Sequence, residues 1–428
     1  MRPVKNIKKF FPGLLTLLNS VADPRDTSRI IYQSKMILFT RIISAIFRFP
    51  SMRRTTAGLN NENTVLNVAN IVGQPLEELP HWSTINNYLE RLDPQELADI
   101  IPKLVKSLIS MQTFKGGKIR NKYWQVLIDG TRLFMINEDD SENNLYKVHR
   151  NPDGTVKWVE YYCYVVEAKL LLPNNIVISI LTEFCENDEG VSPDAATEEG
   201  QEQKKQDCEL KAFYRMEERL KEIFGNMKIC LTLDSLYACE RVFELCERNN
   251  WRYIVRFKEG SIPSIADEFS NAARETTRRY HKIPKGSEVY EYLVAHNYKG
   301  HYLNAVRYSE EGRKYPFFFL TNLPISAKNC VAFVVDGRNR WKIENQGFNI
   351  QKNHGFELTH KFSMNSQAIK NHYYLIQIAH AISQLFEHEF DILKELKMTQ
   401  YEIHDLIKNA FMCRVEDVHI ALDDSDSV

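Results

Sequence analysis

The sequence contains no closely spaced pair of cysteines. Its eight cysteines stand at positions 163, 185, 208, 230, 239, 246, 330 and 413, and no two of them form a C-x-x-C pair. Without such a pair, neither a zinc ribbon nor a dithiol redox motif is indicated. Most of these cysteines lie in apolar runs, as reduced cysteines of a protein core do, which favours a cytoplasmic location.

The sequence also lacks a hydrophobic run long enough to span a bilayer. The longest apolar stretch covers residues 36–47 and contains Arg41, whereas a membrane-spanning helix needs roughly 20 apolar residues. Near the start of the chain, Lys8 and Lys9 interrupt any apolar core of a signal peptide. We therefore expect no membrane partner and no export.

Several sequence signatures of enzymes are missing as well. The chain has no phosphate-binding loop of the form G-x-x-x-x-G-K-[ST], no H-E-x-x-H zinc motif, no G-x-S-x-G elbow and no dinucleotide-binding fingerprint after a strand. These absences leave an ATP-dependent mechanism without support.

The charge of the chain is balanced overall but not locally. The formal net charge is -1, yet residues 1–54 carry eleven Lys or Arg against two acids, Asp23 and Asp26. A basic segment of this kind attracts a polyanion even when the whole chain is neutral. The same charges also fit a solvated helical face, and charge alone does not separate the two interpretations.

Hydrophobic periodicity divides the 428 residues into several regions, as expected for a chain of two or three domains. Residues 1–118 show helical spacing, with Ser83 placed to cap one helix, and Asp93 with Glu96 placed as a capping box for the next. This region is either a DNA-contacting helical domain or a purely structural one. The remaining ranges are a first part of an α/β domain at 119–258, a β-rich insertion at 259–328, further helices at 329–412 and an acidic tail at 413–428.

Within 119–258 the pattern predicts a mixed sheet flanked by helices. Strands are expected at 125–134, 156–172, 176–184, 227–233 and 251–257, with helices at 204–224 and 241–247. Turn-forming residues at 152–154 and 173–175 make the first three strands an antiparallel meander. Strands that alternate with helices in this way indicate the α/β class.

Three acidic residues follow or lie within these elements. Asp129 and Asp234 are placed in or directly after apolar strands, and Glu344 lies in an expected helix at 340–352. Mg²⁺ prefers oxygen ligands, and two ions can be held by a few convergent carboxylates. Asp129 and Asp234 lie side by side if the first and fourth strands are neighbours; taken singly, each also fits an ordinary turn or helix cap.

The stretches around these acids resemble a known family. Leu-Ile-Asp129-Gly130-Thr131, Leu-Thr-Leu-Asp234-Ser235-Leu-Tyr237 and Arg340-Trp-Lys-Ile-Glu344-Asn345 are similar to the three acidic motifs of DDE transposases from bacterial insertion sequences. The separations of 105 residues (234 − 129) and 110 residues (344 − 234) suit the branch that carries a β insertion before the Glu. The resemblance covers about residues 75–390. It implies a ribonuclease H-like fold, with Asp129, Asp234 and Glu344 as catalytic ligands of two Mg²⁺ or Mn²⁺ ions.

The branch also has a signature of Tyr, Arg, Glu and Lys around the third acid. Arg340 is in register four residues before Glu344, whereas Gly337 stands at the tyrosine position. The lysine position is Gln351, which falls nearly on the Glu344 face of a regular helix, while Lys352 comes one residue later and is turned away. Arg338, Arg340, Lys342 and Lys352 are the expected DNA-binding residues, and Trp341 either stacks on a base or fills the core.

The resemblance implies a function, partners and a location. We expect a transposase that cleaves DNA at transposon ends and joins the freed 3′-hydroxyl to target DNA, acting as a dimer on double-stranded DNA, in the cytoplasm of a bacterium near the nucleoid. Binding is expected to depend strongly on salt, because phosphate contacts release counterions. Two alternatives stay open: a transposase-derived DNA-binding protein that does not cut, and a ribonuclease H-like nuclease that cuts without strand transfer.

Overall fold

The computed structural model consists of two compact units, which are described separately. The units are Met1–Leu97 with His354–Glu357 and Gln367–Val428, and Ala98–Asn353 with Leu358–Ser366. The structure describes residues 9–136, 143–191, 206–225, 227–258, 262–272, 278–283, 286–389 and 398–413. The expected acidic tail therefore lies, beyond residue 413, outside the described residues.

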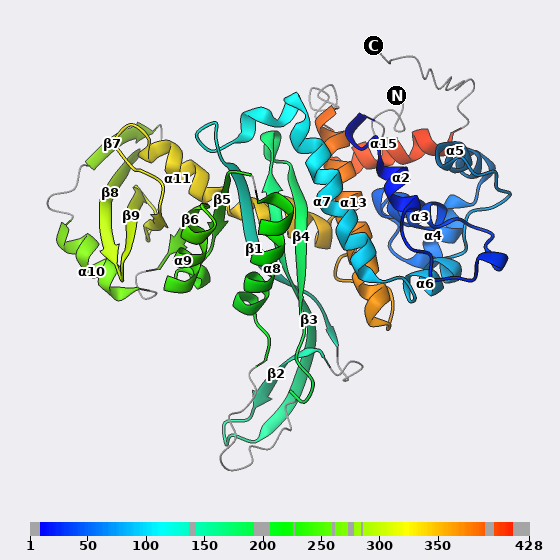
Figure 1. Cartoon of the computed structure of the whole chain (residues 1–428), viewed down its shortest axis with the longest axis horizontal. Coiled ribbons are helices and arrows are strands. Elements are labelled where there is room, and N and C mark those ends of the chain that lie inside the picture. The colour runs from blue at the N-terminus through cyan, green and yellow to red at the C-terminus, as the bar shows by residue number, and fades with distance from the viewer. Residues whose placement is uncertain are drawn as a thin grey trace. The chain divides into compact units, whose positions relative to one another are not determined.

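The first unit is helical and draws on both ends of the sequence (Figure 1). Its elements are α2 (Leu14–Asn19), η1 (Thr27–Arg29), α3 (Ser34–Ile46), α4 (Met52–Leu59), α5 (Glu62–Val72), α6 (Trp82–Leu89), the start of α7 (Pro94–Ser110), α13 (Ser366–Glu389) and α15 (Gln400–Met412). α3 is apolar on nearly all sides and almost wholly buried, as such a helix must be. Arg41 of the basic segment lies inside this core at 2% exposure and donates from Nε to His372 Nδ1 over 3.0 Å, so it is not a surface charge.

Two expected helix caps differ from the structure. α6 begins at Trp82, with His81 Nδ1 accepting from the Ser83 amide over 3.3 Å, so His81 and not Ser83 is the cap. Asp93 Oδ1 accepts from the Gln95 amide over 3.0 Å as expected. Glu96, however, accepts from the Ala22 amide over 3.2 Å, so its carboxylate binds a distant segment of the chain.

The second unit is built on one mixed sheet of ten strands within the described residues. The strands are β1 (Trp124–Ile136), β2 (Leu145–Arg150), β3 (Val156–Leu171), β4 (Val177–Cys185), β5 (Ile229–Leu233), β6 (Arg252–Phe257), β7 (Arg278–Ile283), β8 (Gly286–Tyr298), β9 (His301–Glu310) and β10 (Phe317–Thr321). Their order is β2-β3-β1-β5-β6-β10-β9-β8-β7. β4 also pairs with β3, on the edge opposite β1. The chain thus has the α/β class that the sequence predicts.

The first and fourth strands expected from the sequence are neighbours. β1 runs antiparallel to β3 and parallel to β5, with Leu127 opposite Thr232. Asp129 and Asp234 each follow this pair by two residues. The two aspartates therefore stand at the same level along two adjacent strands, as the sequence analysis required.

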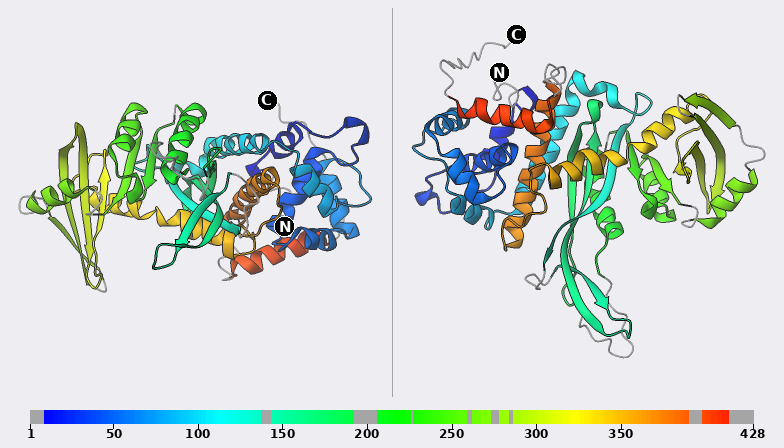
Figure 2. Two further views of the ribbon diagram at one scale, coloured as in Figure 1. Left: turned by 90° about the horizontal axis from the view of Figure 1, so that it is seen from below. Right: turned by 180° about the vertical axis from the view of Figure 1, so that it is seen from behind.

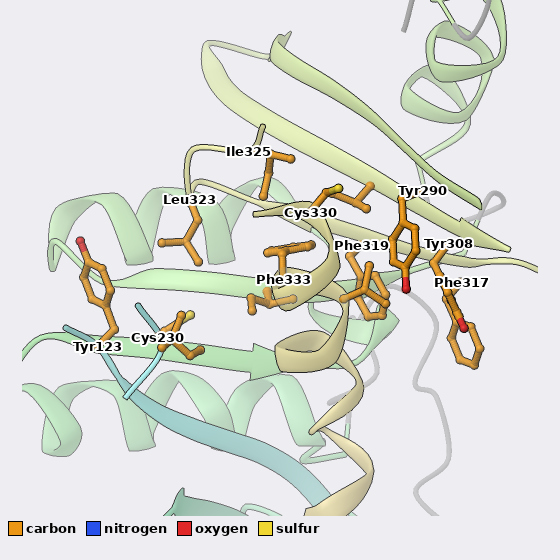
Figure 3. Packing of buried hydrophobic residues seen from close by; sticks show 14 residues of the cluster. Tyr123, Cys230, Tyr290, Tyr308, Phe317, Phe319, Leu323, Ile325, Cys330 and Phe333 are labelled. Atoms are coloured by element: carbon orange, nitrogen blue, oxygen red, sulfur yellow. The ribbon is translucent and has the colours of Figure 1, made fainter. Parts of the chain in front are cut away.

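Two features of the sheet differ from the sequence-based picture. β2 was not expected; it pairs antiparallel with the first half of β3, and the resulting hairpin reaches away from the rest of the sheet (Figure 1). The strands expected as a separate insertion continue the main sheet, because β10 pairs antiparallel with β6. A buried cluster that includes Phe319, Phe333 and Cys230 packs across this junction (Figure 3).

Helices cover both faces of the central strands. The helical elements of this unit after α7 are η2 (Gln112–Gly117), η3 (Pro173–Asn175), α8 (Glu209–Phe224), η4 (Ser235–Tyr237), α9 (Glu240–Arg248), α10 (Pro263–Ala272), α11 (Cys330–Arg338), η5 (Ile343–Phe348) and α12 (Asn349–Asn353). α8 lies on one face of β1 in Figure 1, and α11 with the helical turns after it crosses the opposite face in the rear view of Figure 2. Among the residues that the structure describes, no helix is both long and apolar enough to cross a membrane.

The helix expected at 340–352 is interrupted by a wider turn. η5 is a π-helix, and it leads directly into α12. Ile343 and Phe348 of η5 pack on Leu127 of β1 in a small buried cluster. The π-turn thereby holds the segment around Glu344 against the same strand that carries Asp129.

Candidate functional site

Asp129 lies on the face of β1 that η5 covers. Its Oδ2 accepts from Arg340 Nη1 over 2.8 Å, and its Oδ1 accepts from the Gly130 amide over 3.1 Å. Burial raises the pKa of Asp129 to about 6; Arg340 opposes that rise, whereas the negative charges of Glu209 and Asp234 add to it. Asp129 is thus a half-buried carboxyl group that interacts with two further carboxylates and one guanidinium group.

Asp234 is held by the turn that follows β5. Its Oδ1 accepts from the Leu236 amide over 2.7 Å, which caps the short helix η4. The capping role that a lone aspartate after a strand suggests is therefore present. Its charge also acts on Asp129, so one carboxylate serves the turn and the polar site together.

A buried hydrogen-bond network fixes the helix end from which Arg340 projects. Gln125 of β1 donates from Nε2 to Thr232 Oγ1 of β5 over 2.8 Å and to the Asp336 carbonyl over 2.7 Å. Asn339 Nδ2 donates to Gln125 Oε1 over 3.0 Å. Because both the donor and the acceptor of the Gln125 amide are hydrogen-bonded, this network fixes the end of α11 and the turn that carries Arg340.

The π-turn determines whether Gln351 or Lys352 lies on the same side of the helix as Glu344. Lys352 donates from Nζ to Thr131 Oγ1 over 2.6 Å, and its pKa is lowered by burial against the opposing charge of Glu344. Gln351 is fully buried at 0% exposure. A π-turn contains one residue more than an α-turn, so Lys352, eight residues after Glu344, takes the angular position that a regular helix gives to the seventh. The expectation that Gln351 lies on that face is therefore wrong.

The glycine at the tyrosine position has a packing reason. A Cβ added to Gly337 would lie 2.7 Å from Cε1 of Phe319, which belongs to β10. α11 approaches the sheet too closely there for any larger side chain. The departure from the family signature thus follows from the contact between this helix and the added strands.

The remaining predicted residues divide between the site and its surroundings. Arg338 is exposed, with its guanidinium 5.7 Å from the ring centres of both Tyr308 and Phe317. Lys342 instead faces Asp336, whose charge counters the burial that lowers the Lys342 pKa. Trp341 is 45% exposed, which rules out the core role considered for it.

Sequence reasoning missed Glu209, the first residue of α8. Its Oε2 accepts from the Tyr164 hydroxyl and its Oε1 from the Tyr237 hydroxyl, each over 2.8 Å. A Cβ on Gly130 would lie 2.7 Å from Glu209 Oε2, so only glycine leaves room for this carboxylate beside Asp129. No local pattern marks Glu209, because its neighbours come from β1, β3 and η4.

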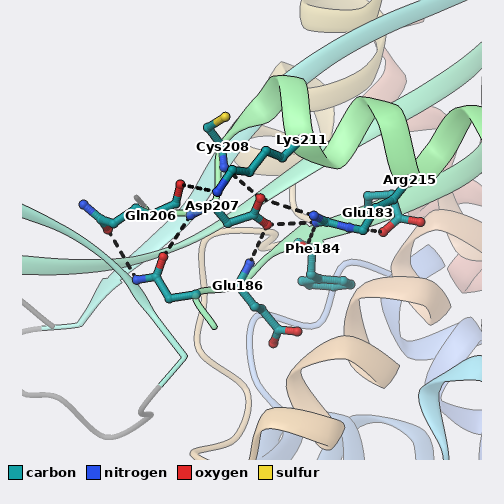
Figure 4. A network of polar contacts seen from close by, with 9 residues as sticks. Glu183, Phe184, Glu186, Gln206, Asp207, Cys208, Lys211 and Arg215 are labelled. Carbon is teal, nitrogen blue, oxygen red and sulfur yellow. Dashed lines mark hydrogen bonds and ion pairs between the residues drawn. The ribbon is translucent and has the colours of Figure 1, made fainter. Parts of the chain in front are cut away.

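A second polar network holds the start of α8 in place (Figure 4). Arg215 Nη2 donates to Asp207 Oδ2 over 2.8 Å, and Arg215 Nε lies 3.6 Å from Glu183 Oε2. Asp207 Oδ2 also accepts from the Glu186 amide over 3.1 Å. Glu183 of β4 therefore helps to anchor α8 through Arg215.

A fully buried ion pair lies in β3, next to η5. Glu167, the cross-strand partner of Asp129, lies 3.3 Å from Lys169 Nζ, and both side chains are 0% exposed. Ser179 donates to Glu167 Oε2 over 2.6 Å, and Lys169 Nζ lies 5.4 Å from the Phe348 ring centre. These contacts compensate the buried charges and fix the surface of β3 on which the π-turn packs.

The carboxyl groups have the oxygen chemistry of a Mg²⁺ or Mn²⁺ site but are not closed around an ion. Within the described part of the chain, no group of three or more His, Cys, Asp or Glu side chains is arranged to hold a metal. Arg340 donates to one oxygen of Asp129, and Glu344 is exposed and interacts with the charge of Lys352. In this conformation the three acids are therefore not gathered around one metal position, although their carboxylate oxygens are suitable ligands for Mg²⁺ or Mn²⁺.

Comparisons with known proteins add little to this geometry. No protein-family model matches the chain, and no curated protein matches it either. Among solved structures, a similar chain is the piggyBac transposase of a synaptic complex with hairpin DNA. The TM-score is 0.42 at 10% identity, over 96% of this chain and 80% of that one. A likeness at this level carries no argument about function, which must come from the residues described above.

Proposed function

We propose that the chain is a DNA transposase with a ribonuclease H-like catalytic unit, which cleaves phosphodiester bonds at transposon ends and joins the 3′-hydroxyl to target DNA. The observation that carries this proposal is the equal level of Asp129 and Asp234 on adjacent parallel strands, under a helix that supplies Arg340, Glu344 and Lys352. The strand order β4-β3-β1-β5-β6, with β3 antiparallel to its neighbours, supports the ribonuclease H-like topology.

The chain's own residues would bind and orient the scissile phosphate. Arg340, in the turn after α11, places its guanidinium group on Asp129, and Lys352 of α12 places its ammonium group on Thr131, two residues further along β1. A guanidinium binds phosphate oxygens with two parallel hydrogen bonds, so Arg340 can exchange Asp129 for phosphate. That exchange would free the Asp129 oxygen it now holds.

Asp129, Asp234 and Glu344 are the proposed ligands of two Mg²⁺ or Mn²⁺ ions. Bound there, such ions would activate the attacking water or hydroxyl and stabilise the leaving oxygen. Because Arg340 holds Asp129 Oδ2 in the described conformation, binding of an ion to that oxygen would require Arg340 to release it. Pairing of two DNA ends is the reason for proposing a dimer on double-stranded DNA.

The Asp234→Ala variant tests the proposal. We expect divalent-dependent cleavage of transposon-end DNA to fall about a thousand-fold or more, since the ions supply several kcal/mol of transition-state stabilisation, while DNA binding is retained. Asp153→Ala, in the exposed turn between β2 and β3, is a control that removes an acid elsewhere and should leave cleavage unchanged. Persistent metal-dependent cleavage in Asp234→Ala would show that the site is misassigned.

One observation favours the alternative of a DNA-binding protein that does not cut. The Arg340–Asp129 ion pair and the lack of a closed metal-ligating group among the described residues suit a site that binds phosphate without metal chemistry. This alternative predicts DNA binding without cleavage in any divalent ion. A nuclease without strand transfer would instead give cleavage but no joined product.

A further inference from the structure

Four arginines gather beside the carboxylates, where the added strands join the sheet. We call Arg256, Arg313, Arg338 and Arg340 the arginine patch. Val255 of β6 stands opposite Leu233 of β5, so Arg256 lies level with Asp234 on the next parallel strand. The other members come from the turn after β9 and from the end of α11.

Aromatic rings hold these guanidinium groups in place. The guanidinium carbons of Arg256, Arg313 and Arg338 lie 5.2, 4.8 and 5.7 Å from the ring centre of Phe317. Arg256 and Arg340 lie 5.9 and 5.4 Å from the ring centre of Trp341. Phe317 itself is buried within the cluster of Figure 3, whereas Arg313 and Arg338 beside it are exposed.

The patch has more positive charge than its acidic neighbours neutralise. Arg340 pairs with Asp129, and Arg313 Nε lies 3.4 Å from Glu310 Oε2. Arg256 and Arg338 have no hydrogen bond or ion pair with any residue that the structure describes. Burial and the charges of Arg340 and Arg313 lower the pKa of Arg256, whereas Asp234 opposes that change. Like charges held together in this way are relieved by a bound anion.

We propose that the arginine patch binds the phosphodiester backbone of double-stranded DNA next to the scissile bond. This inference rests on the proposed function, and it adds Arg256 and Arg313 to the residues that contact DNA. Guanidinium groups stacked on rings keep their N–H donors in a fixed plane, which suits the phosphate oxygens. The patch begins beside Asp129 and Asp234 and continues along β6, β10 and the turn after β9, so it can guide a backbone toward the carboxylates.

The double variant Arg256→Gln/Arg338→Gln tests the patch through binding alone. The probe is a labelled duplex oligonucleotide, measured by fluorescence anisotropy in EDTA over a range of salt concentrations. We expect affinity to fall about tenfold for each lost charge-assisted hydrogen bond, and the slope of log affinity against log salt to fall by about two.

The control variant is Lys228→Gln, which removes an exposed charge at the opposite end of β5 from Asp234. It should bind the duplex within twofold of the unaltered chain. Arg338→Gln alone guards against misfolding, because its exposed side chain is not needed for packing. Inorganic phosphate, as a competitor of the duplex, is the second probe. If phosphate inhibits duplex binding equally in the wild type and the double variant, the anion binds elsewhere, and the proposal is overturned.

The outcomes separate this inference from the proposed function. Unchanged duplex binding in the double variant, together with loss of cleavage in Asp234→Ala, overturns the patch and leaves the transposase proposal standing. Weaker binding and a smaller salt slope support the patch, whether or not the chain cuts DNA. A chain that neither binds nor cuts DNA overturns both.

Discussion

At the scale of single residues, Asp129 combines burial with proximity to other charges. Its pKa of about 6 lies above the ordinary value of 3.8, chiefly because burial disfavours the charged form. The positive charge of Arg340 favours the ionised form and so limits the rise of the Asp129 pKa. A carboxyl group kept in this state is a feature of functional sites more often than of structural ones.

The sign of this pKa shift predicts how Asp129 affects stability. The folded chain holds the Asp129 proton more tightly than the unfolded chain does, so its contribution to stability is full below about pH 4 and is lost as the pH rises through about 6. Metal-free Asp129→Asn should therefore gain stability relative to wild type across this window, by at most about 3 kcal/mol. Urea unfolding at pH 4 and pH 7 measures the difference.

Asp153→Asn provides the opposite sign in the same experiment. Hydrogen bonds from the Thr155 side chain and amide lower the pKa of Asp153, so its contribution appears as the pH rises. A difference between wild type and Asp129→Asn that stays constant from pH 4 to pH 7 would contradict the burial of an ionisable Asp129.

At the scale of elements, the π-turn η5 changes which side chains face the site. It places Lys352 toward Thr131 and turns Gln351 into the interior. The same turn presses Phe348 and Gly347 onto Lys169 of β3, where a Cβ on Gly347 would lie 3.4 Å from Lys169 Cδ and Cε. The register of the helix is thus set by packing against the sheet.

Adjacent substitutions in α12 separate the two roles. Lys352→Met should lower DNA cleavage by about tenfold or more, the effect of losing one charged hydrogen bond to phosphate, while changing stability by less than about 1 kcal/mol. Gln351→Ala should instead lower the free energy of unfolding by about 1–3 kcal/mol, because it truncates a fully buried side chain. Thermal unfolding and a cleavage assay on both variants give the comparison. A reversed pattern would mean that the helix is regular through 343–348.

At the scale of the whole molecule, the chain forms two units, and each unit combines segments that are not contiguous in the sequence. α13 and α15 belong with the amino-terminal helices, whereas the residues between them and those helices form the sheet unit. Leu375 of α13 is fully buried at 0% exposure. The first unit therefore depends on a core that is completed only by the end of the chain.

Leu375→Ala tests this division. The lost apolar volume should destabilise the first unit by about 2–5 kcal/mol, with faster hydrogen exchange in α3, α6 and α15. Exchange in β1 and β5 should not change. Val335→Ala, at an exposed position of α11, is the matched control and should alter exchange in neither unit. Equal loss of protection in both units would show that they unfold as one.

The sequence by itself predicted most of the strands and helices of the sheet unit and the two strand-borne aspartates, but it left open whether their strands are neighbours. Apolar runs predicted a strand that contains Asp129 and a strand that Asp234 follows, and the structure shows that these strands, β1 and β5, are parallel neighbours. Arg340 was placed beside the acids by its spacing from Glu344, and the structure pairs it with Asp129.

Only the tertiary structure decided the rest of the site. Glu209 and Arg256 join it through contacts between segments far apart in sequence, which no local period records. The choice of Lys352 over Gln351 depended on one added residue in a helical turn, and that turn exists because Ile343 and Phe348 both pack on β1. Local spacing predicts the face of a regular helix, but packing decides whether the helix is regular.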